Sequence, residues 1–413
     1  MRRRSFLGLL AAGLPAALAG GAGMAAAQQA PIKIGLIVTL TGRVAQNGRD
    51  LVNGLTLGLD QVNHRMAGRE IQVVVEDDGG TPSGALTKAR KLVELDRVDL
   101  LMGPISANSG YALRDYINEQ KILAIYPVVA SDDLTQRNRT PWIVRTGWTS
   151  SQPNHPLGEY AAKTLHFRRM VAIANDFAFG YESVGGFQRT FELNGGRVIT
   201  HLWPPLSAPD YSPYLGRIPR DIDAVYAEFS GGDALRFLEQ YREFGLAGRI
   251  PLLGGGTLTD ESILFQEGDL AKGVVTALHY SAALNTPANR DFVRLYTRTY
   301  NRVPSYYSEA TYTTVQFLQK GLEAVGGRVE NRSAFVAAVR RVVLPDAPRS
   351  PLRLDGWGNP IENIYIRRVD IVNGQPQNTV IFTYPNVSQF WTFSPEEYLK
   401  QPVYSRDNPP AHP

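Results

Sequence analysis

The sequence predicts an α/β protein of two lobes, each built on a parallel β-sheet with helices on both faces. Short β-branched, apolar segments alternate repeatedly with segments in which apolar residues recur at helical spacing, and parallel sheets covered by helices produce this pattern. The alternation restarts after Arg145 and gives a second run of similar length. Loops rich in Gly, Ser and Asn follow several strands. The restart of the pattern predicts two lobes of one architecture.

The first run opens with the strand Ile32–Val38, whose β-branched and mostly apolar residues are typical of a buried parallel strand. A helix follows, because Leu51, Leu55, Leu59 and Val62 recur at helical spacing. The remaining elements expected in this run are strands at 70–75, 100–103 and 122–125 and a helix at 85–93.

The second run repeats the alternation with shorter strands. Its expected elements are helices at 156–165, 184–193 and 234–241 and strands at 170–174, 197–200, 224–226 and 250–253.

The C-terminal third is less regular. Helices are expected at 289–300 and 308–325. Residues 351–376 predict a β-ribbon with turns at Asp355-Gly356 and Asn373-Gly374. The Pro-rich residues from Asp407 on predict a loose tail.

The N-terminus has the features of an export signal. Arg2, Arg3 and Arg4 precede a short apolar stretch, and Ala25-Ala26-Ala27 forms a small-residue cleavage pattern. Residues 1–27 therefore predict a signal peptide cleaved near Ala27, and a periplasmic protein. The pair Arg3-Arg4 before Ser5-Phe6-Leu7 favours the twin-arginine route. The alternative is an ordinary secretory signal that carries three arginines.

Composition excludes several classes of function. Cysteine is absent, which rules out disulfides, a Cys-based zinc site and a lipoprotein anchor. Three positive charges of the net +4 lie in the leader, and no basic run follows, so we expect no nucleic-acid partner. No later apolar stretch approaches the length of about 18 residues needed to span a membrane, so the mature chain is not expected to do so.

Catalytic and metal-binding motifs are missing. The chain has no Gly-x-Ser-x-Gly, P-loop, Gly-x-Gly-x-x-Gly or His-Glu-x-x-His pattern after the leader. The six histidines lack ligand spacing. Asp77-Asp78 follows a strand and is interpreted as a turn or helix-capping pair rather than an acid–base pair. We therefore expect no enzyme, no metal and no cofactor.

A ligand is expected beyond the carboxyl ends of the strands, near helix N-termini, as in other open α/β sheets. The loops that occupy these positions are 41–48, 103–110, 126–132, 175–181, 228–233 and 254–259.

Short segments in a fixed order carry a resemblance to a known family. They are Ile32-Lys33-Ile34-Gly35 with Thr41-Gly42, Asp77-Asp78-Gly79 with Pro82, Gly103-Pro104-Ile105-Ser106, Tyr126-Pro127, Arg145-Thr146, Asn175-Asp176 with Phe179-Gly180, Asn194-Gly195-Gly196, Asp210-Tyr211-Ser212, and Pro304 with Tyr312. In this order and spacing, from about Ile32 to Thr392, the chain resembles the periplasmic solute-binding proteins of ABC transporters of the branched-chain amino-acid type.

The resemblance implies the type I periplasmic binding protein fold, two Rossmann-like parallel-sheet lobes joined by a three-segment hinge. The crossings should fall near Trp148, Tyr280 and Asn359. Lobe 1 is then 31–148 plus 281–358, lobe 2 is 149–280 plus 359–392, and 393–413 is a C-terminal extension. The family captures a ligand by hinge closure. The implied partners are a small molecule and the membrane permease subunits of an ABC transporter, and a monomer suffices for this role.

Three departures from the amino-acid-binding members bear on the ligand. Ala107 and Ala130 stand where those members carry hydroxyl side chains, and Gly256 stands where they carry the acid that meets the ligand's ammonium. An ammonium buried without a counter-charge is costly. The resemblance to the amino-acid-binding members therefore does not extend to their ligand contacts.

Aromatic residues near the predicted loop ends favour a flat ligand. The chain resembles a subgroup that binds aromatic carboxylates, through Arg145-Thr146-x-Trp148, Asp176 to Gly180 and Asp210 to Tyr214. A carboxylate would be met by backbone N–H groups and side chains at a helix start, and by Arg145, for which a structural ion pair is the alternative. The predicted ligand-binding residues are Gln46, Ser106, Asn108, Ser109, Val128, Val129, Ala130, Arg145, Trp148, Phe177, Phe179, Phe229, Ser230, Gly255, Gly256 and Tyr280.

Other functions stay open on the sequence alone. The same fold serves carriers of branched-chain or other amino acids and amides. A ligand-sensing partner of a membrane receptor would have the same sequence features, and an exported enzyme on this scaffold is a further alternative.

Overall fold

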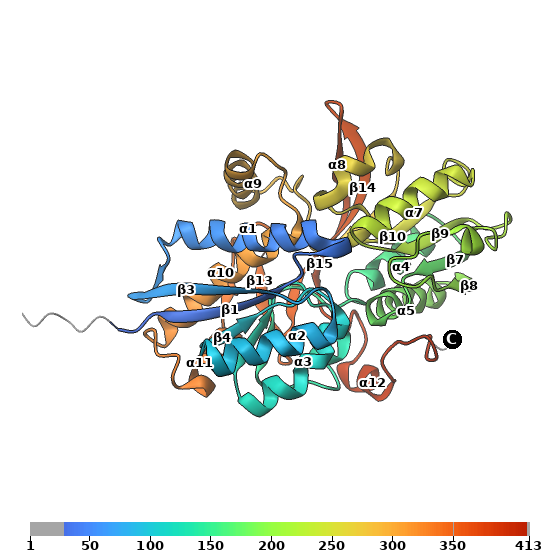
Figure 1. The fold of residues 1–413 in the computed structure, drawn as a ribbon. Helices are drawn as coiled ribbons and strands as arrows, with labels where there is room; N and C mark the ends of the chain where they lie inside the picture. The colour runs from blue at the N-terminus through green and yellow to red at the C-terminus, as the bar shows by residue number, and fades with distance from the viewer. Residues whose placement is uncertain (1–28, 350, 411–413) are drawn as a thin grey trace, which may run out of the picture.

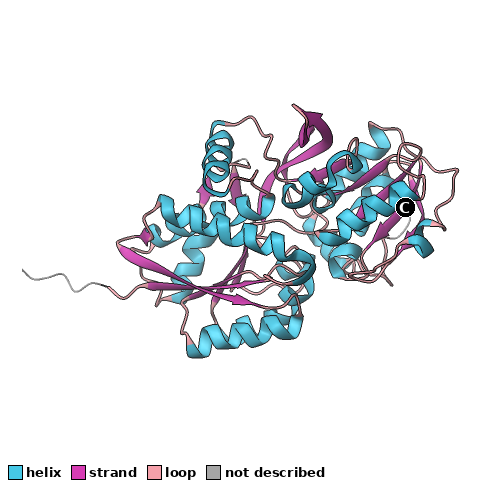
Figure 2. Cartoon of the chain, turned by 45° about the horizontal axis from the view of Figure 1, so that its top comes forward, coloured by secondary structure: helices cyan, strands magenta, loops and turns pink. Residues whose placement is uncertain are grey.

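The computed structural model describes residues 29–349 and 351–410. The predicted signal peptide lies outside the described residues. Two α/β lobes lie side by side (Figure 1), and each has helices on both faces of its sheet (Figure 2). The two-lobed α/β architecture predicted from the sequence is confirmed.

Lobe 1 contains a six-stranded sheet in the order β2-β3-β1-β4-β5-β6. All neighbours are parallel except the short β2–β3 pair. The strands are β1 (Ile32–Val38), β2 (Arg65–Met66), β3 (Arg69–Asp77), β4 (Leu100–Met102), β5 (Leu123–Tyr126) and β6 (Ile143–Arg145).

Helices from distant parts of the sequence cover this sheet. One face packs against α1 (Ala45–Gln61), α10 (Tyr306–Ala324) and α11 (Arg332–Arg340), and the other against α2 (Pro82–Arg90) and α3 (Ala107–Gln120). Helices α1 and α10 approach closely at Gly54, where a Cβ atom would lie 2.0 Å from the carbonyl oxygen of Ser308.

The larger sheet has the order β12-β13-β14-β11-β10-β9-β7-β8, with β15 paired to β14. Most of it belongs to lobe 2, whereas β12 and β13 at one edge pack into the core of lobe 1. The parallel strands are β7 (Arg169–Ala174), β8 (Arg197–Leu202), β9 (Ala224–Glu228), β10 (Leu252–Gly255) and β11 (Val275–Leu278). The antiparallel strands are β12 (Val343–Leu344), β13 (Leu352–Leu354), β14 (Pro360–Val372) and β15 (Gln375–Val387).

The helices of lobe 2 form two layers. Helices α4 (Asn154–Lys163) and α5 (Ala178–Leu193) cover one face, and α7 (Gly232–Glu243) and α8 (Glu261–Glu267) cover the other. The described chain also contains α6 (Ser212–Leu215), α9 (Pro287–Tyr300), α12 (Pro395–Lys400), a π-turn at Lys91–Leu95, and 3-10 turns at Gly42–Val44, Asp132–Thr135, Gly256–Thr259 and Gly268–Leu270.

Some elements differ from those predicted. Strands β6 and β11 and helix α3 were not predicted from the sequence. The predicted ribbon at 351–376 is longer, since β15 continues to Val387. Its turn is at Asn373 and Gly374 as expected, both with positive φ.

The C-terminal segment contacts both lobes. Arg137, in the loop after β5, donates hydrogen bonds to the carbonyl oxygens of Tyr398 (3.0 Å) and Gln401 (2.6 Å). The ring of Tyr404 packs against Gly185 of α5, where a Cβ atom would lie 2.3 Å from Cγ of the ring. The segment therefore joins the loop after β5 to lobe 2.

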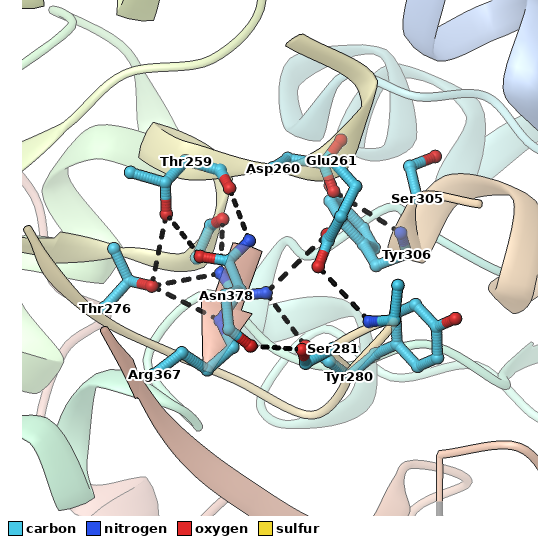
Figure 3. A network of polar contacts seen from close by, with 12 residues as sticks. Thr259, Asp260, Glu261, Thr276, Tyr280, Ser281, Ser305, Tyr306, Arg367 and Asn378 are labelled. Atoms are coloured by element: carbon cyan, nitrogen blue, oxygen red, sulfur yellow. Dashed lines mark hydrogen bonds and ion pairs between the residues drawn. The ribbon is translucent and has the colours of Figure 1, made fainter. Parts of the chain in front are cut away.

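A buried polar network surrounds the segment that joins β11 to α9 (Figure 3). Arg367 of β14 donates to the carbonyl oxygens of Tyr280 and Gly256, each at 2.8 Å. The carboxylate of Glu261 accepts a hydrogen bond from the backbone N–H of Ala282 at 3.2 Å. These bonds fix the backbone where it passes from β11 toward α9.

A buried arginine joins segments that lie far apart in the sequence. Arg349 donates to Glu309 of α10 at 2.8 Å, to Glu362 of β14 at 3.3 Å and to the carbonyl oxygen of Thr146 at 2.9 Å. All three charged side chains are 0–1% exposed. A buried charge that loses its partner is strongly destabilising.

We expect Arg349→Met to lower the free energy of unfolding by about 3–5 kcal/mol, because Glu309 loses its buried cation and Glu362 and the carbonyl oxygen of Thr146 lose a hydrogen-bond donor. Urea denaturation followed by circular dichroism measures the change. The control is Arg353→Met, on an exposed residue of β13. A loss below about 1 kcal/mol for Arg349→Met would show that these carboxylates do not depend on the arginine.

Candidate ligand-binding site

A cavity of about 320 Å³ lies between the two lobes. On the lobe 1 side it is lined by the loops that follow β1, β3, β4 and β5, and on the lobe 2 side by loops after β7, β8, β9 and β10. The carboxyl ends of parallel strands therefore meet at the cavity, as the strand-end argument predicted. The lining residues are Thr39, Thr41–Val44, Gly79, Gly80, Ile105–Ala107, Val128, Ala130, Trp148, Phe177, Phe179, Leu206, Ser207, Ser230, Thr257, Tyr306 and Tyr307.

Aromatic rings form one wall of the cavity. Trp148 meets Phe179 edge-on at 5.6 Å and Tyr306 at 6.1 Å between ring centroids. Phe177 packs 5.9 Å from Phe179, and Tyr307 lies 4.0 Å from Tyr306. The indole N–H of Trp148 has no hydrogen-bond partner within residues 29–349 and 351–410. This wall suits a flat apolar group.

The polar lining has one cation and no carboxylate. Arg43, half-buried, donates to the hydroxyl of Ser230 at 3.2 Å, and its guanidinium lies 5.9 Å from the centre of the Phe177 ring. Helix α3 begins at Ala107, and its N-cap residue Ser106 makes no side-chain capping bond. A guanidinium and the first N–H groups of a helix are both anion-binding groups. The lining is therefore chemically suited to a carboxylate.

The acidic pair after β3 has a turn role. Asp78 accepts hydrogen bonds from the Thr39 hydroxyl at 2.6 Å and from the N–H of Gly80 at 2.9 Å. Asp77 accepts from the N–H groups of Leu40 (3.0 Å) and Gly79 (2.9 Å). These bonds shape the loops that carry Thr39, Gly79 and Gly80 to the cavity.

The predicted site residues fall into two groups. Seven lie on the cavity lining: Ser106, Val128, Ala130, Trp148, Phe177, Phe179 and Ser230. Nine lie off it: Gln46, Asn108, Ser109, Val129, Arg145, Phe229, Gly255, Gly256 and Tyr280.

Arg145 is directed into the protein rather than into the cavity. Its guanidinium donates to the carbonyl oxygens of Val129, Ser131 and Trp148, the last two at 2.6 and 2.9 Å. The side chain is 0% exposed. In this arrangement, Arg145 does not make the bidentate contact with a ligand that was considered for it. Its structural role is to bond carbonyl groups, not to pair with an acid.

The other residues off the lining have identifiable surroundings. Phe229 stacks on Phe237 at 4.5 Å in the core of lobe 2, and Val129 packs against α3. Gln46 bonds Asp50 on α1 at 2.8 Å. Tyr280 is fully buried beside the Figure 3 network. Asn108 and Ser109 are the second and third residues of α3 and lie beyond Ala107, the α3 residue that lines the cavity. Gly255 packs against Glu228, and Gly256 packs against Leu278.

Several lining residues were not predicted. Arg43, Thr39 and Thr41 lie in or beside the first strand-end loop, so the position of that loop could have drawn attention to them. Tyr306 and Tyr307 come from the start of α10, far away in the sequence, and only the fold brings them to the cavity. Thr257 lies in the expected loop 254–259, whereas Leu206 and Ser207 lie in a loop that was not among those expected.

Comparison with known proteins identifies the family. Residues 31–376 match the family model described as periplasmic binding protein. The chain belongs to the periplasmic binding protein family. The family consists of solute-binding receptors, and this member falls with those of branched-chain amino-acid type ABC transporters.

Individual relatives place this periplasmic binding protein more closely. It is 27% identical to "Leu/Ile/Val-binding protein homolog 6" of Brucella melitensis, over 82% of this chain and 87% of the relative. An ABC transporter substrate-binding protein from Sphaerobacter thermophilus shares 34% identity at a TM-score of 0.82, over 87% of this chain and 99% of that chain.

A solute-binding protein of Rhodopseudomonas palustris, solved in complex with benzoate, shares 28% identity at a TM-score of 0.81, over 87% and 97% of the two chains. Another from strain BisB5, in complex with 3,4-dihydroxybenzoic acid, shares 28% identity at a TM-score of 0.82, over 87% and 98%.

The described part of the chain lacks two features. No helix there is both long and apolar enough to cross a membrane. No group of three or more His, Cys, Asp or Glu side chains there is arranged to hold a metal ion.

The two lobes also contact each other at the cavity's edge. Asn47 of α1 donates to the hydroxyl of Ser262 at 3.0 Å. Gly231, with φ of 57°, lies so near lobe 1 that a Cβ atom would be 2.5 Å from the carbonyl oxygen of Arg43. No real Cβ atom tolerates such a distance, so this arrangement of the lobes requires glycine at 231.

We expect Gly231→Ala to hold the lobes apart and to weaken ligand binding by about tenfold, equivalent to about 1.4 kcal/mol. Small-angle scattering with ligand present should give a larger radius of gyration than the wild type. Gly245→Ala is the matched control, since Gly245 has a similar φ of 68° and a Cβ atom added there would have no neighbour within 4 Å. Equal behaviour of the two variants would contradict the role of this contact.

Proposed function

We propose that this periplasmic binding protein captures an aromatic carboxylate in the cavity between its lobes and delivers it to the permease subunits of an ABC transporter. The observation that carries the proposal is the lining: one guanidinium, hydroxyl groups, a helix N-terminus and an aromatic wall, with no Asp or Glu. A zwitterionic amino acid would bury its ammonium there without a counter-charge, which is costly. A carboxylate on a flat ring needs only the groups that are present.

The relatives support this choice of ligand class. Two solved relatives at 28% identity were captured with benzoate and with 3,4-dihydroxybenzoic acid. The curated relatives carry Leu/Ile/Val-binding names, which makes a branched-chain amino acid the second candidate.

The proposal also covers the export of the protein and the closure of its two lobes. The protein is exported through its twin-arginine leader, is cleaved near Ala27 and acts in the periplasm as a monomer. Closure takes place about crossings near Trp148, Tyr280 and Asn359, with lobes of 31–148 plus 281–358 and 149–280 plus 359–392. Hydrogen bonds near two of these crossings support their position, Arg367 to Tyr280 and Asn359 to Gln152 at 3.0 Å.

A thermal-shift screen of the mature protein tests the ligand class. Benzoate, hydroxybenzoates and cinnamate form one panel, and leucine, valine and phenylalanine the other. A ligand at 100 times its Kd stabilises the folded state by about 2.7 kcal/mol. We expect the melting temperature to rise by a few degrees with aromatic acids alone. A rise with amino acids and none with aromatic acids would replace the proposal with the second candidate.

We expect Arg43→Gln to weaken benzoate binding by about 10–100-fold, because a hydrogen bond to a charged partner contributes about 1.5–3 kcal/mol. Isothermal titration calorimetry measures the change. The control is Arg49→Gln, an exposed arginine of α1 that lies off the cavity and bonds Gln46 at 3.0 Å. Unchanged affinity in Arg43→Gln would exclude this guanidinium as the carboxylate partner.

A further inference from the structure

A carboxyl group lies directly behind the lobe 2 wall of the cavity. Glu228 ends β9 and is 1% exposed. Its Oε1 lies 2.6 Å from the hydroxyl of Thr257, which lines the cavity, and its Oε2 lies 3.3 Å from the hydroxyl of Tyr226. Glu228 is thus separated from a bound ligand by a single side chain.

The neighbouring strand is shaped around this carboxyl. At Gly255 of β10, a Cβ atom would lie 1.5 Å from Oε2 of Glu228. Any larger residue at 255 would occupy the space of the acid. The position of Glu228 is therefore a specific feature of the wall and depends on glycine in the adjacent strand.

The surroundings of Glu228 offer no positive charge. Within the described chain, no Lys, Arg or His forms an ion pair with it. The titratable groups that face it are tyrosines: Tyr226 on its own strand, and Tyr306 and Tyr307 at the start of α10. Burial raises the pKa of the Glu228 carboxyl to about 8, opposed by the hydrogen bonds with Thr257 and Tyr226. An ionised form would be a buried, uncompensated charge.

Counting protons at Thr257 leads to the same conclusion independently. Its hydroxyl oxygen lies 2.8 Å from the carbonyl oxygen of Phe229 and 2.6 Å from Oε1 of Glu228. A hydroxyl has one proton, and a carbonyl oxygen can only accept. Both contacts are two-centre hydrogen bonds only if Thr257 donates to Phe229 and Glu228 donates to Thr257. The hydroxyl of Tyr226 donates to Oδ1 of Asn154 at 2.9 Å, so its longer contact of 3.3 Å with Oε2 of Glu228 has no proton of its own.

We propose that Glu228 is a specificity-determining residue, held as a neutral carboxylic acid that donates to Thr257, so that the cavity wall accepts an anionic ligand and offers no counter-charge to an ammonium. The proposal rests on the proposed function for the sign of the ligand's charge. Gly255 leaves the space that the Glu228 carboxyl group occupies, and Thr257 separates this carboxyl group from the ligand.

The proposal implies that binding of an anion and ionisation of Glu228 oppose each other. Below the pKa of the carboxyl, the affinity for a carboxylate is independent of pH. Above pH 8 the proton must be taken up for the anion to bind, so the affinity falls by up to about tenfold per pH unit.

The experiment is calorimetric titration of benzoate into the mature protein from pH 6.5 to pH 9.5. The wild type should bind with constant affinity up to about pH 8 and more weakly above it. Glu228→Gln should bind with no such decline, because a carboxamide also donates to Thr257 but does not titrate. Glu267→Gln is the matched control and should behave as the wild type. Glu267 is a buried acid of lobe 2 whose pKa is also raised by burial. Its carboxyl group has no hydrogen-bond partner in the described chain and does not line the cavity.

Two further measurements keep the proposal testable if Glu228→Gln does not fold or benzoate does not bind. Titration at pH 8.5 in buffers of different ionisation enthalpy should show proton uptake by the wild type on binding. In the ligand-free protein, the ¹³C carboxyl resonance absent from Glu228→Gln should have the shift of a neutral acid at pH 7.

The outcomes separate the two proposals. Absence of benzoate binding, together with a neutral carboxyl resonance, would overturn the proposed ligand and leave Glu228 as inferred. A flat pH profile in the wild type, a decline that persists in Glu228→Gln, or an ionised resonance at pH 7 would overturn the role of Glu228.

Discussion

The cavity depends on one buried guanidinium that never reaches it. Arg145 bonds the carbonyl oxygens of Val129, Ser131 and Trp148, and so fixes the loop after β5 against the first crossing. With that backbone held, Val128, Ala130 and Trp148 present their side chains to the ligand space. Burial lowers the pKa of Arg145 to about 10, so it stays charged at neutral pH. Carbonyl groups compensate for the water it has lost.

The two lobes contribute different chemistry to the same space. Lobe 1 brings the guanidinium of Arg43, small residues and the start of α3, while the aromatic rings come from the crossing, from lobe 2 and from α10. On the lobe 2 side, the carboxyl group of Glu228 lies behind Thr257. Selectivity in such a site depends on the absence of a negative charge that could pair with an ammonium group, as well as on the groups that bind the ligand.

The sequence predicted the fold well because the fold depends on periodicity, which is local. Strand β1 and helices α9 and α10 lie within two residues of their predicted bounds. The site was harder, because loop position does not determine side-chain direction. In the loop after β5, Val128 and Ala130 face the cavity and Val129 faces the core. Similarly, Ser230 lines the cavity and Phe229 does not. An arginine was expected at the carboxylate, but the tertiary structure brings Arg43 rather than Arg145 to the lining.

The attachment of the C-terminal segment has a mechanical consequence. Arg137 holds it on the lobe 1 side through Tyr398 and Gln401, and Tyr404 is held on the other side by its fit against Gly185. Separation of the lobes would load this segment in tension. The weaker of the two attachments then limits how far the lobes can separate before a contact breaks. The residues that set this limit, Tyr398, Gln401 and Tyr404, lie beyond those that match the family model.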